Sequence, residues 1–200
     1  MDVTTAAVVL LFVVSIFSGF GNTNISVTNK SNTLPPETRT IHQEVSVTAP
    51  DPSYVDDPAA QAAINKYICQ YRPAEEAATI SNSIVRYSKD YNVNPKLVAA
   101  LMRRESRFNP RAVSSSGAMG LGQLLPSTCK GLKIDDGFDI DQNAKGTVRY
   151  MKSLLDRFKG KVASAIAGYL EGPNAVSRQG GFSNHTKGYV EDILKIYQKI

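Results

Sequence analysis

A glutamate near the end of a predicted helix is the residue of this sequence best placed for acid–base chemistry. The helix begins at Asn94-Pro95, because Asn caps the first turn and proline at the first helical position lacks only an N–H that has no partner there. Leu97, Leu101 and Glu105 follow at four-residue spacing, so the carboxyl group extends the apolar stripe. Apolar surroundings disfavour the charged form of a carboxyl group and raise its pKa toward the range of a general acid.

The same spacing allows a second interpretation, in which Glu105 forms an ion pair at the helix end. Three arginines lie close enough in the sequence to be its partner, namely Arg103, Arg104 and Arg107. Spacing alone leaves both interpretations open.

The segment after this helix favours a binding site. Residues 114–123 contain three glycines, which is too many for a regular helix, and apolar residues that need burial. A phosphate-binding loop would follow a strand and end in Gly-Lys-Ser or Gly-Lys-Thr, and this segment does neither. A glycine-rich loop with an amide side chain, directly after a carboxyl group on an apolar helix face, indicates a carbohydrate cleft.

Amphipathic helices are predicted on both sides of this region. In five further segments, apolar residues recur at the 3.6-residue period of a helix. Alternating strand patterns are almost absent between 59 and 200, so the sequence predicts a mainly α fold. The five stripes are Ile64, Tyr67, Ile68 and Tyr71; Ala77, Ile80, Ile84, Tyr87 and Tyr91; Val148, Met151, Leu155 and Phe158; Val162, Ala165, Ile166 and Tyr169; and Val190, Ile193, Leu194 and Tyr197.

Four groups of residues resemble the motifs of a known family and occur in its order between residues 76 and 197. The groups are 105–106 with 112–124 and 126–128, then 141–143 (Asp-Gln-Asn), 168–173 (Gly-Tyr-Leu-Glu-Gly-Pro) and 186–190 (Thr-x-x-Tyr-Val). Together they resemble the SLT-type lytic transglycosylases, which belong to the lysozyme-like superfamily with goose-type lysozyme. The resemblance implies a lysozyme-like fold, within that α+β superfamily, and a single catalytic domain.

The resemblance also implies an activity, which is non-hydrolytic cleavage of peptidoglycan glycan strands at the MurNAc-β-1,4-GlcNAc bond to give 1,6-anhydro-MurNAc ends. Glu105 matches the single catalytic residue of the family, which acts as acid and then as base, and no cofactor is implied. Without the resemblance, a core aromatic at helical spacing would be the favoured interpretation of each tyrosine. The residues that match substrate-binding positions are Ser114, Gly120, Gly122, Gln123, Tyr169 and Tyr189.

The sequence departs from the family pattern beside the expected site. Gly122 stands where Met is usual, Leu170 replaces the usual Asn, and Glu171 adds a carboxylate. Two alternatives therefore stay open. One is a hydrolytic goose-type muramidase, which would need a second carboxylate to position water, with Glu171 or Asp135-Asp136 as candidates. The other is a catalytically silent peptidoglycan-binding protein.

The composition of the chain limits its partners and excludes several kinds of site. Its 200 residues carry a formal net charge of +5, which favours anionic partners. Two cysteines and two histidines are too few for a disulfide-dense scaffold or a multi-histidine site, so we expect no metal. A nucleic-acid partner would fit the charge but neither the motifs nor the export signal, so we expect none.

The N-terminal segment predicts export. Residues 6–20 are a run of 15 without charge, which is short for a membrane-spanning helix and typical of a secretory signal. We therefore expect a signal peptide or membrane anchor over 1–21, a disordered linker over 22–58 and the catalytic domain over 59–200. The protein would be periplasmic or in the cell envelope. If the anchor is not cleaved, it would hold the protein to the inner membrane. A wall-spanning secretion or envelope complex is a candidate partner.

Two cysteines lie in the part expected to be exported, where a disulfide persists. A bond between Cys69 and Cys129 would tie the first helix of the domain to the segment after the glycine-rich loop. The alternative is that both are small buried hydrophobic side chains.

Overall fold

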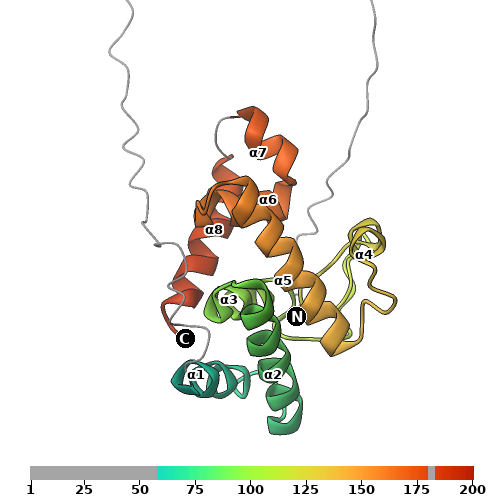
Figure 1. The fold of residues 1–200 in the computed structure, drawn as a ribbon, viewed down its shortest axis with the longest axis vertical. Coiled ribbons are helices and arrows are strands. Elements are labelled where there is room, and N and C mark those ends of the chain that lie inside the picture. The colour runs from blue at the N-terminus through green and yellow to red at the C-terminus, as the bar shows by residue number, and fades with distance from the viewer. Residues whose placement is uncertain (1–57, 180–182) are drawn as a thin grey trace, which may run out of the picture. The chain divides into compact units, whose positions relative to one another are not determined.

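The computed structural model describes residues 58–179 and 183–200, where the backbone is helical apart from loops and two isolated β-bridges. The mainly α fold predicted from the sequence is confirmed. The predicted leader and all but the last residue of the predicted linker lie outside the described residues. The helices are α1 (Pro58–Ile68), α2 (Ala74–Tyr91), α3 (Pro95–Ser106), α4 (Pro126–Leu132), α5 (Ile140–Arg157), α6 (Val162–Glu171), α7 (Pro173–Gln179) and α8 (Asn184–Tyr197) (Figure 1).

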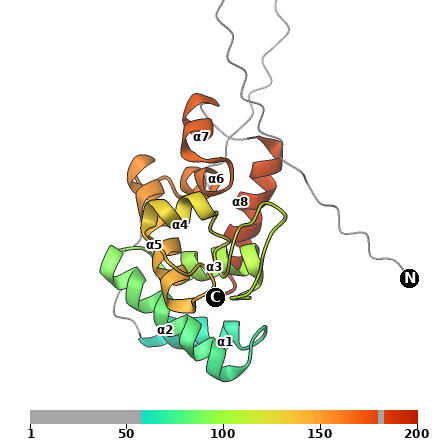
Figure 2. The same ribbon diagram turned by 90° about the vertical axis from the view of Figure 1, so that its right-hand side faces the viewer.

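The central helix is α3, and from Leu97 to Met102 it is buried on every side. The residues from Leu97 to Met102 are each at most 3% exposed, so this stretch has no face toward solvent. Contacts join α3 to α1, α2, α5 and α8, and Figures 1 and 2 show these helices around it. Because α3 is held from all sides, it fixes the position of the residues at its end.

The five predicted stripes lie on α1, α2, α5, α6 and α8, except that Tyr71 and Phe158 follow the ends of α1 and α5, and all five pack into one core around α3. The short helices α4 and α7, of seven residues each, carry no such stripe and were not predicted. Fully buried members of the stripes include Ile64, Ile68, Ile80, Ile84, Val148, Met151, Ile166 and Ile193.

Local chemistry fixes both ends of α3. At the N-terminus the Asn94 side chain accepts a hydrogen bond from the Lys96 N–H at 2.9 Å, which is the predicted cap. At the C-terminus Arg107 and Phe108 have φ angles of +54° and +60°, in the left-handed region where helices commonly end. The chain therefore turns sharply one residue after the helix ends.

A buried ring anchors this turn. Phe108 is fully buried, and its ring centre lies 6.3 Å from that of Tyr67 and 5.9 Å from that of Tyr71. Tyr67 of α1 and Tyr71 in the segment after α1 hold this ring in place. Because Phe108 is only three residues after Glu105, the same contacts hold the end of α3.

The glycine-rich segment between α3 and α4 forms neither a helix nor a sheet, as its composition predicted. Its two isolated bridges join Met119 to Val113 and to Leu124. Leu124 then packs with Cys129 and Ile134 in a small cluster separate from the main core.

The disulfide suggested by the sequence is not formed, because Cys69 and Cys129 are both free thiols. Cys129 is buried on α4 in the small cluster, whereas Cys69 is exposed just after α1, with its thiol 3.6 Å from Asn65 Oδ1. The two thiols thus have different surroundings, and only Cys129 fits the alternative of a small buried side chain. Among the described residues, no helix has the length and hydropathy to cross a membrane.

Truncating Leu101 to alanine should cost about 2–5 kcal/mol of unfolding free energy, because this side chain is fully buried in α3 and leaves a cavity. The matched control is Leu125→Ala, which removes the same atoms from a side chain that is 42% exposed. It should cost about 1 kcal/mol or less. Chemical denaturation of the full chain measures both, and equal losses would contradict the central position of α3.

Candidate active site

Glu105 lies in the last turn of α3, and the residue as a whole is partly exposed. The Tyr189 hydroxyl on α8 donates a hydrogen bond to Glu105 Oε1. Burial raises the pKa of Glu105 above the ordinary glutamate value, and it outweighs the Tyr189 hydrogen bond and the Arg104 charge, which lower it. The carboxyl group therefore keeps its proton to a higher pH than an exposed glutamate does.

The arginines beside this carboxyl group have other contacts. Arg104 forms an ion pair with Asp192 at 3.5 Å, and its guanidinium lies 5.2 Å from the centre of the Tyr189 ring. Arg103 lies 4.3 Å from the centre of the Tyr71 ring. These contacts fit the interpretation of a carboxyl group on an apolar helix face better than that of an ion pair.

The glycine loop, residues 119–122, is fixed beside α3 by side chains from three helices. Ser106, which follows the glutamate on α3, donates from Oγ to the Leu121 carbonyl at 2.7 Å. From α6, the Tyr169 hydroxyl donates to the Gly122 carbonyl at 2.7 Å. The loop and the end of α3 are thus held as one unit.

The third support is Asn143 of α5, whose role was not predicted. Its side-chain nitrogen donates to the Met119 carbonyl at 2.9 Å and to the Gly137 carbonyl at 2.7 Å. Its Oδ1 accepts from the Gly122 N–H at 2.9 Å. Because the side chain is fully buried, these bonds replace those that water would make. Asn143 therefore joins the glycine loop to the loop before α5.

A sequence signal for this role does exist. Asn143, Thr147 and Met151 recur at four-residue spacing on the buried face of α5, and a polar side chain on such a face needs partners. The Asp-Gln-Asn motif was instead assigned to a helix start. In the structure the cap lies earlier, because the Asp139 side chain accepts from the Gln142 N–H at 2.8 Å.

Packing within the protein requires glycine at positions 120 and 122, because each lies against buried neighbours that leave no room for a Cβ. A Cβ on Gly122 would lie 2.0 Å from Thr147 Oγ1, and one on Gly120 would lie 2.3 Å from the Gly137 carbonyl oxygen. Gly120 also has a φ of +70°, which residues with side chains rarely adopt. The close approach predicted from these glycines is an approach to α5 and to the loop before it, and contact with a substrate stays a prediction.

Ser114 and Gln123 also shape the loop. Ser114 Oγ accepts from two backbone N–H groups of its own turn, at 3.0 and 3.2 Å. The Gln123 amide donates to the Ala112 and Gly120 carbonyls at 3.1 and 3.0 Å. Substrate binding by these two side chains likewise stays a prediction.

Tyr169 and Tyr189 supply two phenols from α6 and α8. Burial raises the pKa of each well above the ordinary tyrosine value, and the charge of Glu105 raises it further. Both hydroxyls therefore keep their protons near neutral pH and can donate. The structure brings these three predicted residues together, as one carboxyl group with two neutral phenols.

The other carboxylates noted in the sequence have contacts of their own. Glu171 Oε1 accepts hydrogen bonds from the Ser183 hydroxyl, at 3.1 Å, and from the Thr186 hydroxyl. Nowhere in 58–179 and 183–200 are three or more His, Cys, Asp or Glu side chains grouped so that they could hold a metal ion.

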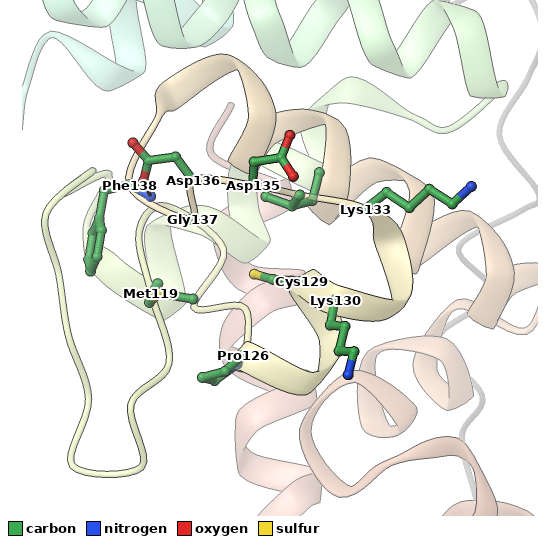
Figure 3. A pocket seen from close by; sticks show the side chains of 10 residues that line it. Met119, Pro126, Cys129, Lys130, Lys133, Asp135, Asp136, Gly137 and Phe138 are labelled. Atoms are coloured by element: carbon green, nitrogen blue, oxygen red, sulfur yellow. Dashed lines mark hydrogen bonds between the residues drawn. The ribbon is translucent and has the colours of Figure 1, made fainter.

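Asp135 and Asp136 line a separate hollow of about 750 Å³ between α4 and the loop that precedes α5 (Figure 3). Met119, Cys129 and Phe138 are among its other lining residues. The hollow touches the glycine loop at Met119 and includes none of the three acid–base groups, so it is distinct from the candidate active site.

Comparison with known proteins places this geometry in a family context. The family model "Transglycosylase SLT domain" matches residues 82–191. A transglycosylase of Enterobacteria phage PRD1 is 39% identical over 108 residues, which cover 54% of this chain and 39% of that protein. Membrane-bound lytic murein transglycosylase F of Pectobacterium atrosepticum is 30% identical over 122 residues, which cover 58% of this chain and 23% of that protein. The match thus spans less than half the length of either relative.

Two solved structures share the fold. The lytic transglycosylase Slt of Pseudomonas aeruginosa, solved as an inactive mutant, has a TM-score of 0.53 at 22% identity over 68% of this chain and 28% of its own. The 70 kDa soluble lytic transglycosylase of Escherichia coli has a TM-score of 0.55 at 19% identity over 72% and 31%. These likenesses confirm the predicted lysozyme-like fold.

Gly122→Ala should destabilise the protein by about 1–3 kcal/mol, because the new methyl group overlaps the Thr147 side chain. Adding Thr147→Ala should restore part of the loss, since it removes the two nearest atoms. Gly131→Ala is the control: no atom lies within 4 Å of its Cβ, and alanine favours a helix, so stability should stay level or rise. Thermal unfolding compares wild type, Gly122→Ala, Thr147→Ala, the double variant and Gly131→Ala. Simple addition of the Gly122 and Thr147 losses would contradict the packing.

Glu105→Gln should stabilise the protein at neutral pH and give little gain in acid. Because the pKa of Glu105 is raised in the folded state, its contribution to stability is present below the unfolded pKa and is lost as the pH rises through the folded pKa. Glutamine cannot ionise and still accepts from Tyr189, so it avoids that loss. Thermal unfolding from about pH 4 to pH 8 tests this. If the stability gain of Glu105→Gln over wild type shrinks as the pH rises, the prediction is contradicted.

Proposed function

Because this chain belongs to the transglycosylase SLT-domain family, we propose that it cleaves the MurNAc-β-1,4-GlcNAc bond of peptidoglycan without using water as the nucleophile. The observation that carries this proposal is the environment of Glu105, a partly exposed residue whose carboxyl group has a raised pKa and a phenol as its hydrogen-bond partner. Such a group keeps its proton to a higher pH than an exposed glutamate does, and it can donate that proton and later take one back.

In the first proposed step Glu105 acts as an acid. Its proton passes to the glycosidic oxygen, the bond from that oxygen to C1 of MurNAc breaks, and the GlcNAc part leaves as an alcohol. The electron deficiency left at C1 is relieved by the oxygen of the substrate's own N-acetyl group. Glu105 is then a carboxylate, and the Tyr189 hydrogen bond stabilises that charged form.

In the second step the same carboxylate acts as a base. It removes the proton from the 6-hydroxyl of MurNAc, and that oxygen bonds to C1 and displaces the N-acetyl oxygen. The product is a 1,6-anhydro ring, and Glu105 has regained its proton. One carboxyl group thus completes the cycle, and no water enters the products.

The residues around Glu105 are proposed to hold the sugars in position. Tyr169 and Tyr189 border the carboxyl group, and Ser114 and Gln123 would bind the N-acetyl and sugar groups from the loop they shape. Gly120 and Gly122 would contribute backbone to the cleft. Support comes from the hydrogen bonds that make this loop rigid, since fixed groups orient a substrate at low cost.

A hydrolytic muramidase is less well supported. It would need a second carboxylate that positions water, and Glu171 already accepts hydrogen bonds from two hydroxyls. Asp135 and Asp136 line the separate hollow. A catalytically silent binding protein gives no reason for the raised pKa of Glu105.

We propose a location outside the cytoplasm, in the periplasm or cell envelope. The uncharged run at residues 6–20 supports export, and relatives named as membrane-bound murein transglycosylases support the envelope. We also propose that an uncleaved N-terminal segment would anchor the protein, and that a wall-spanning secretion or envelope complex is a candidate partner.

Digestion of purified peptidoglycan by the full chain should release products that are lighter by one water than hydrolysis products, as measured by mass spectrometry. Glu105→Gln should lower the rate by about 100-fold or more, because the acid and the base are lost together. Glu191→Gln, at an exposed carboxylate of α8, is the matched control and should keep the wild-type rate. Reducing ends of hydrolytic mass, or no products from folded wild-type protein, would overturn the proposal.

A further inference from the structure

Glu171 ends α6, and its carboxylate holds the first turn of α8. Its Oε1 accepts hydrogen bonds from the hydroxyls of Ser183 and Thr186. Ser183 is also the N-cap of α8, because its Oγ accepts from the Thr186 N–H at 3.2 Å. The carboxylate therefore binds the two side chains that define where α8 begins.

The helix that is held in this way carries the hydrogen-bond partner of the acid–base group. Thr186 and Tyr189 are three residues apart, so they lie on the same face of α8, and both are buried. One turn of helix thus separates the hydroxyl bound by Glu171 from the ring whose hydroxyl binds Glu105.

The helix that carries Glu171, α6, also supplies a residue of the candidate active site. Tyr169, which holds the glycine loop, lies two residues before Glu171 on α6. Figures 1 and 2 show α6 and α8 side by side, in agreement with their contacts. The Glu171 carboxylate therefore joins the two helices that supply both phenols.

A carboxylate suits this position electrostatically. The N-terminus of α8 presents backbone N–H groups and the positive end of the helix dipole, which favour a negative group nearby. Glu171 thus has both hydrogen-bond donors and a favourable field, and it holds α8 more firmly than a neutral side chain would.

We propose that Glu171 is a positioning residue, which fixes the first turn of α8 through Ser183 and Thr186 and thereby keeps the Tyr189 hydroxyl on Glu105. As a statement about turnover this rests on the proposed function, but the hold of Tyr189 on Glu105 can be measured without turnover. The groups that shift the pKa of Glu105 are Tyr189 from α8 and Arg104 from α3, the latter paired with Asp192. Tyr169 from α6 lies close enough for the charge of Glu105 to raise its own pKa.

The test compares variants of the full chain. Glu171→Ala removes both hydrogen bonds, Thr186→Val removes one at nearly constant shape, and Glu171→Gln keeps an oxygen that can accept. Tyr189→Phe is the reference for complete loss of the hydrogen bond to Glu105. Glu191→Ala removes an exposed carboxylate from α8 as the matched control.

The first measurement is the titration of Glu105 by carbon-13 NMR of labelled glutamate, with its signal assigned through Glu105→Gln. The Tyr189 hydrogen bond lowers the pKa of Glu105, so Tyr189→Phe should raise it. Glu171→Ala and Thr186→Val should shift it in the same direction by a smaller amount, and Glu171→Gln should stay nearer to wild type. A Glu105 titration in Glu171→Ala and Thr186→Val that matches wild type and Glu191→Ala would overturn the proposal.

The second measurement is the turnover of peptidoglycan. Glu171→Ala should lower kcat about three- to tenfold, because loosening the single hydrogen bond from Tyr189 to Glu105 costs at most about the free energy of one hydrogen bond. The change in KM should be smaller. In the Tyr189→Phe background it should cause little further loss, because both changes act on the same contact. Losses that multiply would overturn the positioning role. A wild-type protein without activity would contradict the proposed function alone, since the NMR titration still decides the role of Glu171.

Discussion

The site depends on satisfying the backbone of a buried loop that has neither helix nor sheet to pair with. The glycine loop packs so closely against α5 that its N–H and carbonyl groups lose contact with water, and unpaired groups there would be costly. Neighbouring loop carbonyls pair the Met119 and Gly120 N–H groups. Side chains supply further partners: Asn143 from α5, Tyr169 from α6 and Ser106 from α3. Because Ser106 follows Glu105 directly, the bonds that satisfy the loop also fix it beside the carboxyl group.

Two opposing effects act on that carboxyl group, and both serve the proposed chemistry. Burial favours the protonated form needed to donate a proton, while the Tyr189 hydrogen bond favours the carboxylate needed to accept one. A group that must do both in one cycle works best when neither form is strongly preferred. The surrounding core, which buries α3 on every side from Leu97 to Met102, allows this unfavourable burial to persist.

The sequence predicted the features that depend on local pattern. The Asn94 cap, the helical stripes and the place of Glu105 on an apolar face each follow from spacing along one helix. Features that depend on contacts between distant segments were missed or wrong. The hydrogen bonds of Asn143 join α5 to two loops, those of Glu171 join α6 to α8, and Cys69 and Cys129 turned out to have different surroundings. Family motifs marked these regions without giving the direction in which each side chain points.

The proposed chemistry needs one carboxyl group and no water, and the contacts of Glu171 and the separate hollow around Asp135 support Glu105 as that group. Cleavage of peptidoglycan in water enriched in oxygen-18 tests this most directly, because the label follows the nucleophile itself. Mass spectrometry of the released fragments should find no oxygen-18 at the new MurNAc ends. One labelled oxygen for each bond cleaved would mean that water attacks C1, and it would contradict the single-carboxyl account.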